Sequence, residues 1–126
     1  MNRKEFGHNF REMLIWQDAI VIAKGTYVLT SRFPESEKYG LSSQMRRAAV
    51  SIASNIAEGS GRYSDVEFAR FLNIALTSAY ELETELMISF EVGYIPEEEY
   101  KSFLMKIISE QKKIRQFKKQ LSVNVQ

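Results

Sequence analysis

Carboxylates at helical spacing are the side chains in this sequence that come closest to a catalytic set. Glu81 and Glu85 lie four residues apart, and Glu58 belongs to an earlier segment. In a four-helix bundle such glutamates hold a di-iron centre only together with two Glu-x-x-His motifs. The one histidine, His8, lies in a polar N-terminal stretch, so this ligand set cannot be assembled. We therefore expect no metal and no cofactor, and we interpret the glutamates as a solvated helix face.

Nucleophilic catalysis has no better support. The chain has no cysteine, and a serine nucleophile needs a base that a third group orients. Five serines in the predicted helices have neither a helical histidine nor a lysine three residues later: Ser42, Ser43, Ser51, Ser54 and Ser78. The turn Gly59-Ser60-Gly61 is too short for a phosphate-binding loop and lacks its lysine. We expect that the protein is not an enzyme.

Arginines form the second chemical feature. Arg46 and Arg47 are adjacent in the second predicted helix, and Arg62 follows the end of that helix. Guanidinium groups match phosphate oxygens in bidentate geometry, which makes the three arginines candidates for nucleic-acid contact. The alternative is pairing between helices. We expect at least one of the adjacent arginines to pair with Glu81 or its neighbours.

Charge is distributed unevenly along a chain whose net charge is only +1. Residues 101–126 carry seven basic residues against the single acid Glu110, whereas residues 64–92 carry six acids against Arg70. A basic helix that repeats around a symmetry axis can attract nucleic acid. The further candidates for phosphate contact are Lys112, Lys113, Arg115, Lys118 and Lys119.

The elements that carry these residues are predicted to be helical. Apolar residues recur at intervals of three and four over four segments, about 12–32, 41–58, 64–92 and 96–122. In the first segment, Leu14, Val21 and Val28 widen the inward stripe. With 126 residues, 44% of them hydrophobic, the chain suits one domain spanning residues 1–126, of which we expect 1–10 to be flexible. The predicted fold is all-α, an antiparallel up-and-down four-helix bundle.

Local signals predict where the helices end. Pro34 disfavours helix in the residue before it and places a loop between the first two helices. Gly59 and Gly61 are predicted to end the second helix, because glycine accepts the left-handed conformation. Ser64 and Glu67 have the spacing of a capping box, in which each side chain bonds the backbone N–H of the other residue.

Two stretches without charge, residues 48–57 and 71–80, predict an interface between subunits. A surface helix of a monomer normally shows a polar stripe, and monomers rarely expose large apolar patches. We therefore expect a homo-oligomer. Because the link between the two helices is short, we expect antiparallel packing with Ser54 near Phe68 and Arg47 near Ala75. The interface candidates are Ala49, Ser51, Ala53, Ser54, Ala57, Ile74 and Ser78.

Several motifs resemble those of a known family. These are Trp16, then Phe33-Pro34-x-x-Glu37-x-Tyr39-Gly40-Leu41-x-x-Gln44-x-Arg46-Arg47-Ala48-Ala49-x-Ser51-Ile52, and then Asn55-Ile56-Ala57-Glu58-Gly59. The sequence is similar, over about residues 10–122, to the four-helix-bundle proteins encoded in intervening sequences of bacterial 23S ribosomal RNA genes. This resemblance implies a ring-shaped homopentamer. It implies no catalytic residues, because the family's biochemical role is poorly defined.

Two functions stay open at this point. The first is binding of RNA or DNA through phosphate contacts, which the resemblance also suggests. The second is a protein-binding adaptor or scaffold, since a related bundle is an accessory of the reverse transcriptase of diversity-generating retroelements. Tyr39, Tyr63 and Tyr94 either stack on bases or anchor loops, and we expect anchoring. The sequence shows no secretion signal and no apolar run near the roughly 18 residues that span a bilayer, so we expect a cytoplasmic protein with no membrane contact.

Overall fold

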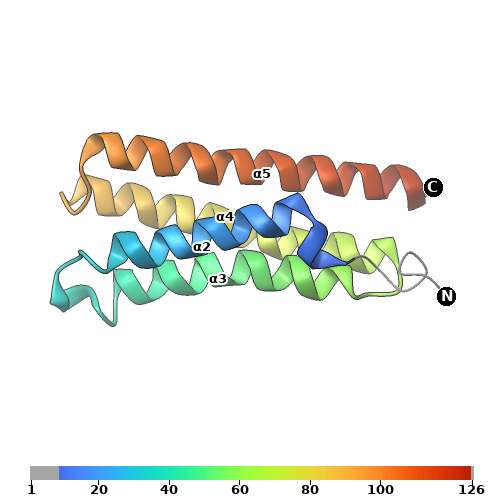
Figure 1. Cartoon of the computed structure of the whole chain (residues 1–126), viewed down its shortest axis with the longest axis horizontal. Coiled ribbons are helices and arrows are strands. Elements are labelled where there is room, and N and C mark those ends of the chain that lie inside the picture. The colour runs from blue at the N-terminus through green and yellow to red at the C-terminus, as the bar shows by residue number, and fades with distance from the viewer. Residues whose placement is uncertain (1–8, 126) are drawn as a thin grey trace.

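The described part of the chain folds into four α-helices that run antiparallel, as predicted (Figure 1). The computed structural model describes residues 9–125, with side chains through residue 121. We expected residues 1–10 to be flexible. Residues 1–8 lie outside the described part of the chain, whereas Asn9 caps a short 3-10 helix that begins at Phe10. The elements are η1 (Phe10–Glu12), α2 (Leu14–Thr30), η2 (Glu35–Glu37), α3 (Leu41–Ser60), α4 (Asp65–Glu91) and α5 (Glu97–Val125).

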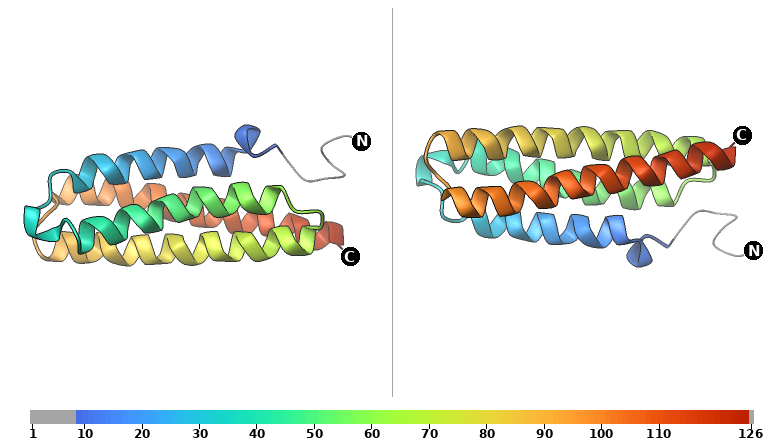
Figure 2. Two further views of the ribbon diagram at one scale, coloured as in Figure 1. Left: turned by 90° about the horizontal axis from the view of Figure 1, so that it is seen from below. Right: turned by 90° about the horizontal axis from the view of Figure 1, so that it is seen from above.

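Each helix packs against two neighbours. The contacting pairs are α2 with α3, α3 with α4, α4 with α5, and α5 with α2. Within the described residues α2 does not contact α4, so these two helices lie diagonally opposite (Figure 2). The α3–α4 loop and the C-terminal end of α5 share one end of the rod, and the other two loops share the opposite end.

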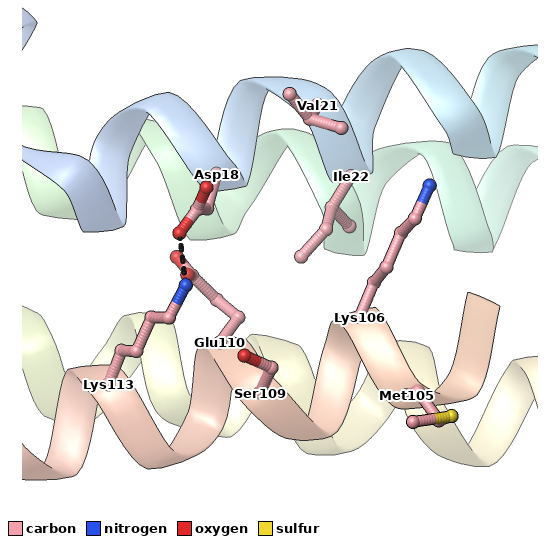
Figure 3. Close-up of a pocket in the computed structure, with 8 residues that line it drawn as sticks. All are labelled: Asp18, Val21, Ile22, Met105, Lys106, Ser109, Glu110 and Lys113. Carbon is pink, nitrogen blue, oxygen red and sulfur yellow. Dashed lines mark hydrogen bonds and ion pairs between the residues drawn. The ribbon is translucent and has the colours of Figure 1, made fainter. Parts of the chain in front are cut away.

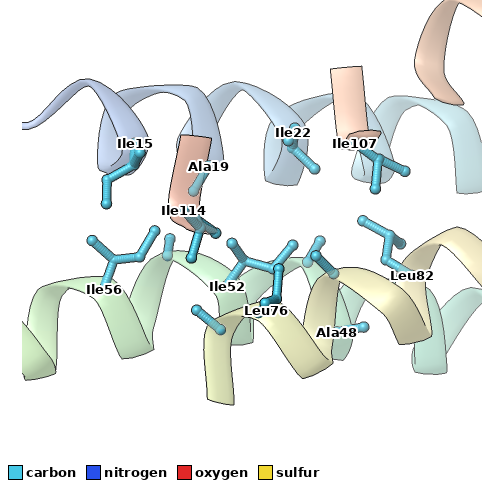
Figure 4. Close-up of a cluster of buried hydrophobic side chains, with 14 of the residues drawn as sticks. Ile15, Ala19, Ile22, Ala48, Ile52, Ile56, Leu76, Leu82, Ile107 and Ile114 are labelled. Carbon is cyan, nitrogen blue, oxygen red and sulfur yellow. The ribbon is translucent and has the colours of Figure 1, made fainter. Parts of the chain in front are cut away.

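The core consists of the inward stripes of all four helices (Figure 4). Ile22, Ile52, Leu72 and Ile107 are almost inaccessible to solvent, as the three-and-four spacing predicted. The prediction that Leu14, Val21 and Val28 belong to the inward apolar stripe of α2 is wrong. Leu14, Val21 and Val28 are 54–69% exposed, because a helix in a bundle turns only one side inward and these three positions lie on the other side.

The predicted capping box is half formed. The Ser64 hydroxyl accepts a hydrogen bond from the Glu67 N–H at 3.1 Å, which satisfies one free donor at the start of α4. The Glu67 carboxylate pairs with Arg70 at 3.2 Å, within the same first turns of the helix. The start of α4 therefore relies on Ser64 alone for its side-chain cap.

Gly61 ends α3 as predicted, but the predictions that Gly59 helps to end the helix and that its end adopts the left-handed conformation are wrong. Only Gly93 has a positive φ, 88°, among the residues described. Gly59 lies inside α3, and a Cβ there would come within 2.7 Å of the Phe71 Cβ. Gly61 caps the helix at φ −89°. Gly59 is thus needed for the close approach of α3 to α4.

The register of α3 against α4 also differs from the prediction. The Ser51 and Ser78 hydroxyls lie 2.7 Å apart, and Gly59 lies opposite Phe68 and Phe71. Ser54 is therefore not beside Phe68, nor is Arg47 beside Ala75. The first turn of α4 extends past the end of α3, which shifts the pairing by about two helical turns.

We predict that Gly59→Ala destabilises the fold by about 1–3 kcal/mol, because the added methyl group overpacks the contact with Phe71. The matched control is Gly61→Ala, whose Cβ would have no neighbour closer than 3.7 Å. Urea unfolding followed by circular dichroism measures both. Equal stability of the two variants would show that α3 and α4 tolerate a larger separation at this end.

Candidate nucleic-acid interface

A cluster of cations lies on the outer side of α5. Lys112, Arg115, Lys118 and Lys119 surround, together with Gln116, a shallow hollow of about 460 Å³. Residues at spacings of three, four and seven share one helix face, so the sequence alone places Lys112, Arg115 and Lys119 side by side. We call these four cations the α5 basic cluster.

Neutral groups of α4 position this cluster. The Arg115 guanidinium donates to the Tyr80 hydroxyl at 2.9 Å, and the Lys118 ammonium donates to the Asn73 amide oxygen at 2.6 Å. A carboxylate in either place would offset the positive charge, whereas a phenol and an amide orient the side chains without adding a negative charge of their own. Lys112 and Lys119 are exposed. The cluster is therefore a cationic surface in which α4 orients two of the four side chains, Arg115 and Lys118.

Lys113 does not belong to this surface. It projects from α5 toward α2 and forms an ion pair with Asp18 at 2.8 Å (Figure 3). The spacing Ser109-x-x-Lys112, which sequence reasoning overlooked, is not a catalytic pair either. Ser109 lines a cavity between α2 and α5, whereas Lys112 lines the hollow of the basic cluster.

The three candidate arginines are dispersed. Arg46 turns to α2, where its Nε donates to the Thr30 hydroxyl at 2.8 Å and its guanidinium lies 4.7 Å from the Tyr27 ring centroid. Arg62 pairs with Glu58 at 3.1 Å in the loop after α3. Neither is joined to the α5 basic cluster by any contact between described residues.

Arg47 lies at a polar hollow on the outer side of α3 and α4, with Gln44, Ser51, Ser78 and Glu81. The prediction that Arg46 or Arg47 pairs with Glu81 or its neighbours is wrong for the described residues. Among the described residues Arg47 makes no direct ion pair, although its charge does stabilise the ionised form of nearby Glu85.

Glu85 is buried, not solvated as we expected from the sequence. Only 6% of it is exposed, and burial raises its pKa to about 7. The charge of Glu81 and a hydrogen bond with that carboxyl act in the same direction, while Arg47 opposes them. Helical periodicity places Glu85 on the inward side, beside Leu82 and Leu86. This spacing could have predicted its burial, but we assigned Glu85 to the solvated face because it is charged.

Glu110 is the second buried acid, with 1% of it exposed. It borders a cavity of about 300 Å³ between α2 and α5, and neither carboxyl oxygen has a hydrogen-bond partner among the described residues (Figure 3). Burial raises its pKa to about 8, and Asp18 adds to this effect while Lys113 opposes it. The only acid of the basic C-terminal segment is thus protonated at neutral pH and does not offset the α5 basic cluster.

The seven interface candidates divide by burial. Ala49, Ala53 and Ser78 are buried within their own chain, so packing of α3 on α4 accounts for their small size. Ser51 and Ala57 are half-buried, and Ser54 and Ile74 are exposed. The exposed side of α4 from residue 73 to 88 contains one charged residue, Glu81: its members are Asn73, Ile74, Thr77, Tyr80, Glu81, Thr84, Met87 and Ile88.

A second exposed and mostly uncharged face, which we did not predict from the sequence, lies on α2. Lys24 is its one charged residue, and the exposed residues are Leu14, Gln17, Ile20, Val21, Lys24, Tyr27 and Val28. Because α2 and α4 lie diagonally opposite in the bundle, these two apolar faces point away from each other. We call them the α2 face and the α4 face.

Of the three loop tyrosines, Tyr94 anchors its loop in the expected way. Its hydroxyl donates to the Glu37 carboxylate at 2.8 Å, and its ring packs on Phe33. Tyr39 and Tyr63 are 88% and 81% exposed, so burial holds neither side chain in place.

Comparison with known proteins identifies the family. The family model described as 23S rRNA-intervening sequence protein matches residues 11–116. The chain belongs to this family. The crystal structure of a protein of unknown function from the S23 ribosomal protein family of Bacteroides thetaiotaomicron VPI-5482 superposes with a TM-score of 0.76 at 27% identity, covering 84% of this chain and 99% of that one. No curated protein matches the chain.

The motifs that carried the resemblance to the 23S rRNA-intervening sequence proteins have structural roles here. The Glu37 carboxylate accepts from the Leu41 N–H at 3.1 Å, which caps α3, and also from Tyr94. The Asn55 amide donates to the Ser51 carbonyl at 2.8 Å. Glu58 holds Arg62. Glu37 and Glu58 thus hold the loops at the two ends of α3, Asn55 bonds within that helix, and the family assignment carries no reaction with it.

Two further properties concern the residues that the structure describes. They contain no group of three or more metal-ligating side chains that could hold a metal ion. Nor is any of their helices long and apolar enough to cross a membrane.

We predict that this family member loses stability as the pH rises from about 4.5 to 8, because unfolded Glu110 ionises above 4.5 whereas folded Glu110 stays protonated up to about 8. Glu110→Gln should remove this part of the slope and raise the free energy of unfolding at pH 8 by on the order of 3 kcal/mol. Urea unfolding at a series of pH values measures it. The control is exposed Glu98→Gln, and an unchanged slope in Glu110→Gln would contradict the assignment.

Proposed function

We propose that this protein is a non-enzymatic, homo-oligomeric bundle that binds nucleic acid in the cytoplasm through the phosphates. The observation that carries the proposal is the α5 basic cluster: four cations around one hollow, two of them oriented by neutral α4 groups. Contacts of this kind position a phosphate backbone without reading its sequence. Binding should therefore be largely independent of sequence.

Oligomerisation is supported by the placement of the two apolar faces. A ring requires a heterologous interface, in which one surface of a subunit meets a different surface of the next. The α2 face and the α4 face lie on diagonal helices and carry opposite single charges, Lys24 and Glu81. Burial of one face against the other would cover both. We propose the homopentamer that the family resemblance implies, with five α5 basic clusters in one particle.

A protein-binding adaptor is the second candidate. The α2 face favours it, because exposed Leu14, Val21 and Tyr27 suit a protein partner such as a polymerase or a reverse transcriptase as well as they suit a second copy. The two candidates differ in which surface is essential. An adaptor depends on the α2 face, and nucleic-acid binding depends on the α5 basic cluster.

We predict that replacing Lys112 and Lys119 together with alanine weakens RNA binding at least tenfold at low salt. The slope of log affinity against log salt should fall by about 2, since each lost phosphate contact releases fewer counterions. Fluorescence anisotropy with a structured RNA, between about 50 and 200 mM salt, measures both quantities.

The matched control removes two exposed lysines at the opposite end of the rod, Lys38 and Lys101. Equal loss in the two double variants would attribute binding to net charge and contradict a localised cluster. Absence of any binding by the unsubstituted protein at low salt would refute nucleic-acid binding altogether.

We predict that Val21→Glu and Ile74→Glu each yield monomers, because each places a charge in one apolar face. Both residues are exposed in the single chain, so the fold should persist. When the two variants are mixed, the intact α4 face of one can still bind the intact α2 face of the other. Sedimentation velocity should then show heterodimers.

A two-fold interface would behave differently, since Ile74→Glu would remain associated through paired α2 faces, or Val21→Glu through paired α4 faces. That result, or an unsubstituted protein that sediments with the mass of one chain at micromolar concentration, would contradict the ring.

A further inference from the structure

An exposed aromatic ring lies at the end of the rod that carries the C-terminal half of α5. Tyr63 belongs to the loop between α3 and α4 and is 81% exposed. This loop and the C-terminal end of α5 are at the same end of the molecule (Figures 1 and 2). The ring therefore faces solvent close to the cations proposed to hold a phosphate backbone.

Contacts on both sides fix the loop that presents Tyr63. The preceding residue, Arg62, pairs with Glu58 at 3.1 Å, and its guanidinium lies 4.5 Å from the Phe71 ring centroid. The following residue, Ser64, caps α4. The loop backbone is thus held while Tyr63 remains largely exposed, so little backbone entropy remains to be lost on binding.

The α5 basic cluster reaches the same part of α4. The rings of Phe68 and Phe117 pack at 5.5 Å between centroids, and Lys118 donates to Asn73. Lys118 and Lys119 follow Phe117 directly, while Tyr63 precedes Phe68 by only five residues, just before the first turn of α4. A strand on the basic cluster therefore needs only a few nucleotides to reach the ring.

We propose that Tyr63 is a stacking platform for an unpaired base, so that the nucleic acid bound by the α5 basic cluster is single-stranded. This inference rests on the proposed nucleic-acid binding. Bases in a duplex are stacked on each other and offer no face to a side chain, whereas an unpaired base stacks on an aromatic ring whatever its identity. The loop lies at the end of the rod, so the α2 and α4 faces can be covered while Tyr63 stays accessible.

The test compares Tyr63→Ala, Tyr63→Phe and Tyr39→Ala for binding to a short single-stranded RNA and to a duplex of the same sequence at low salt. Tyr39 is the matched control, because it is 88% exposed, also lies beside a cation, and occupies the opposite end of the rod. Tyr63→Ala should weaken single-strand binding by roughly 5- to 100-fold, which corresponds to the loss of one stacked base. Tyr63→Phe should bind normally, as should Tyr39→Ala.

Three results would overturn the inference: unchanged single-strand affinity in Tyr63→Ala, an equal loss on the duplex, or an equal loss in Tyr39→Ala. Melting temperatures of all variants show whether each is folded. Failure of the underlying proposal looks different, since the unsubstituted protein would then bind neither RNA at low salt. Binding of both RNAs without any contribution from Tyr63 would remove the stacking platform and leave phosphate binding in place.

Discussion

The close approach of α3 to α4 is the contact on which the rest of the structure depends. Gly59, Ala49, Ala53, Ala75 and Ala79 are small and almost fully buried, and the Ser51 and Ser78 hydroxyls meet between the two helices. Small residues on the inward sides bring the backbones together. The larger residues of the same uncharged stretches, such as Ile74 and Tyr80, are consequently left on the outside. The burial of small residues between α3 and α4 thus produces both a dense core and an apolar outer surface.

The opposite seam, between α2 and α5, is packed less closely. Phe103 contacts Gly25 near one end, where a Cβ on the glycine would come within 2.7 Å of the ring. Toward the end where α2 begins and α5 ends the two helices diverge (Figure 2), and two hollows lie along the seam between them. The carboxyl group of Glu110 lies at the first of these hollows, and the Asp18–Lys113 ion pair spans the seam. A buried neutral acid at this place adds no negative charge beside the α5 basic cluster.

The sequence was sufficient for those features that depend on neighbouring residues along the chain. Helical periodicity located all four helices, and the spacing of Lys112, Arg115 and Lys119 placed them on one face. Features that depend on tertiary packing were out of reach. The register at Ser51, the burial of Glu85 and the turn of Arg46 toward Thr30 each follow from which helix lies opposite, and no local rule specifies that. The α2 face could not be predicted for the same reason. Apolar residues next to an inward stripe, such as Val21 and Val28, can be either buried or exposed, and the sequence pattern is the same in both cases.

The proposed function depends on one cationic surface, the α5 basic cluster. The central claim is that the Lys112 and Lys119 ammonium groups contact phosphates when RNA is bound. Chemical footprinting of lysines by acetylation and mass spectrometry, with and without RNA, tests this claim most directly. The account predicts that Lys112 and Lys119 are protected by RNA, while Lys38 and Lys101 at the other end of the rod react as before. Uniform protection of all four lysines, or none at Lys112 and Lys119, would contradict it.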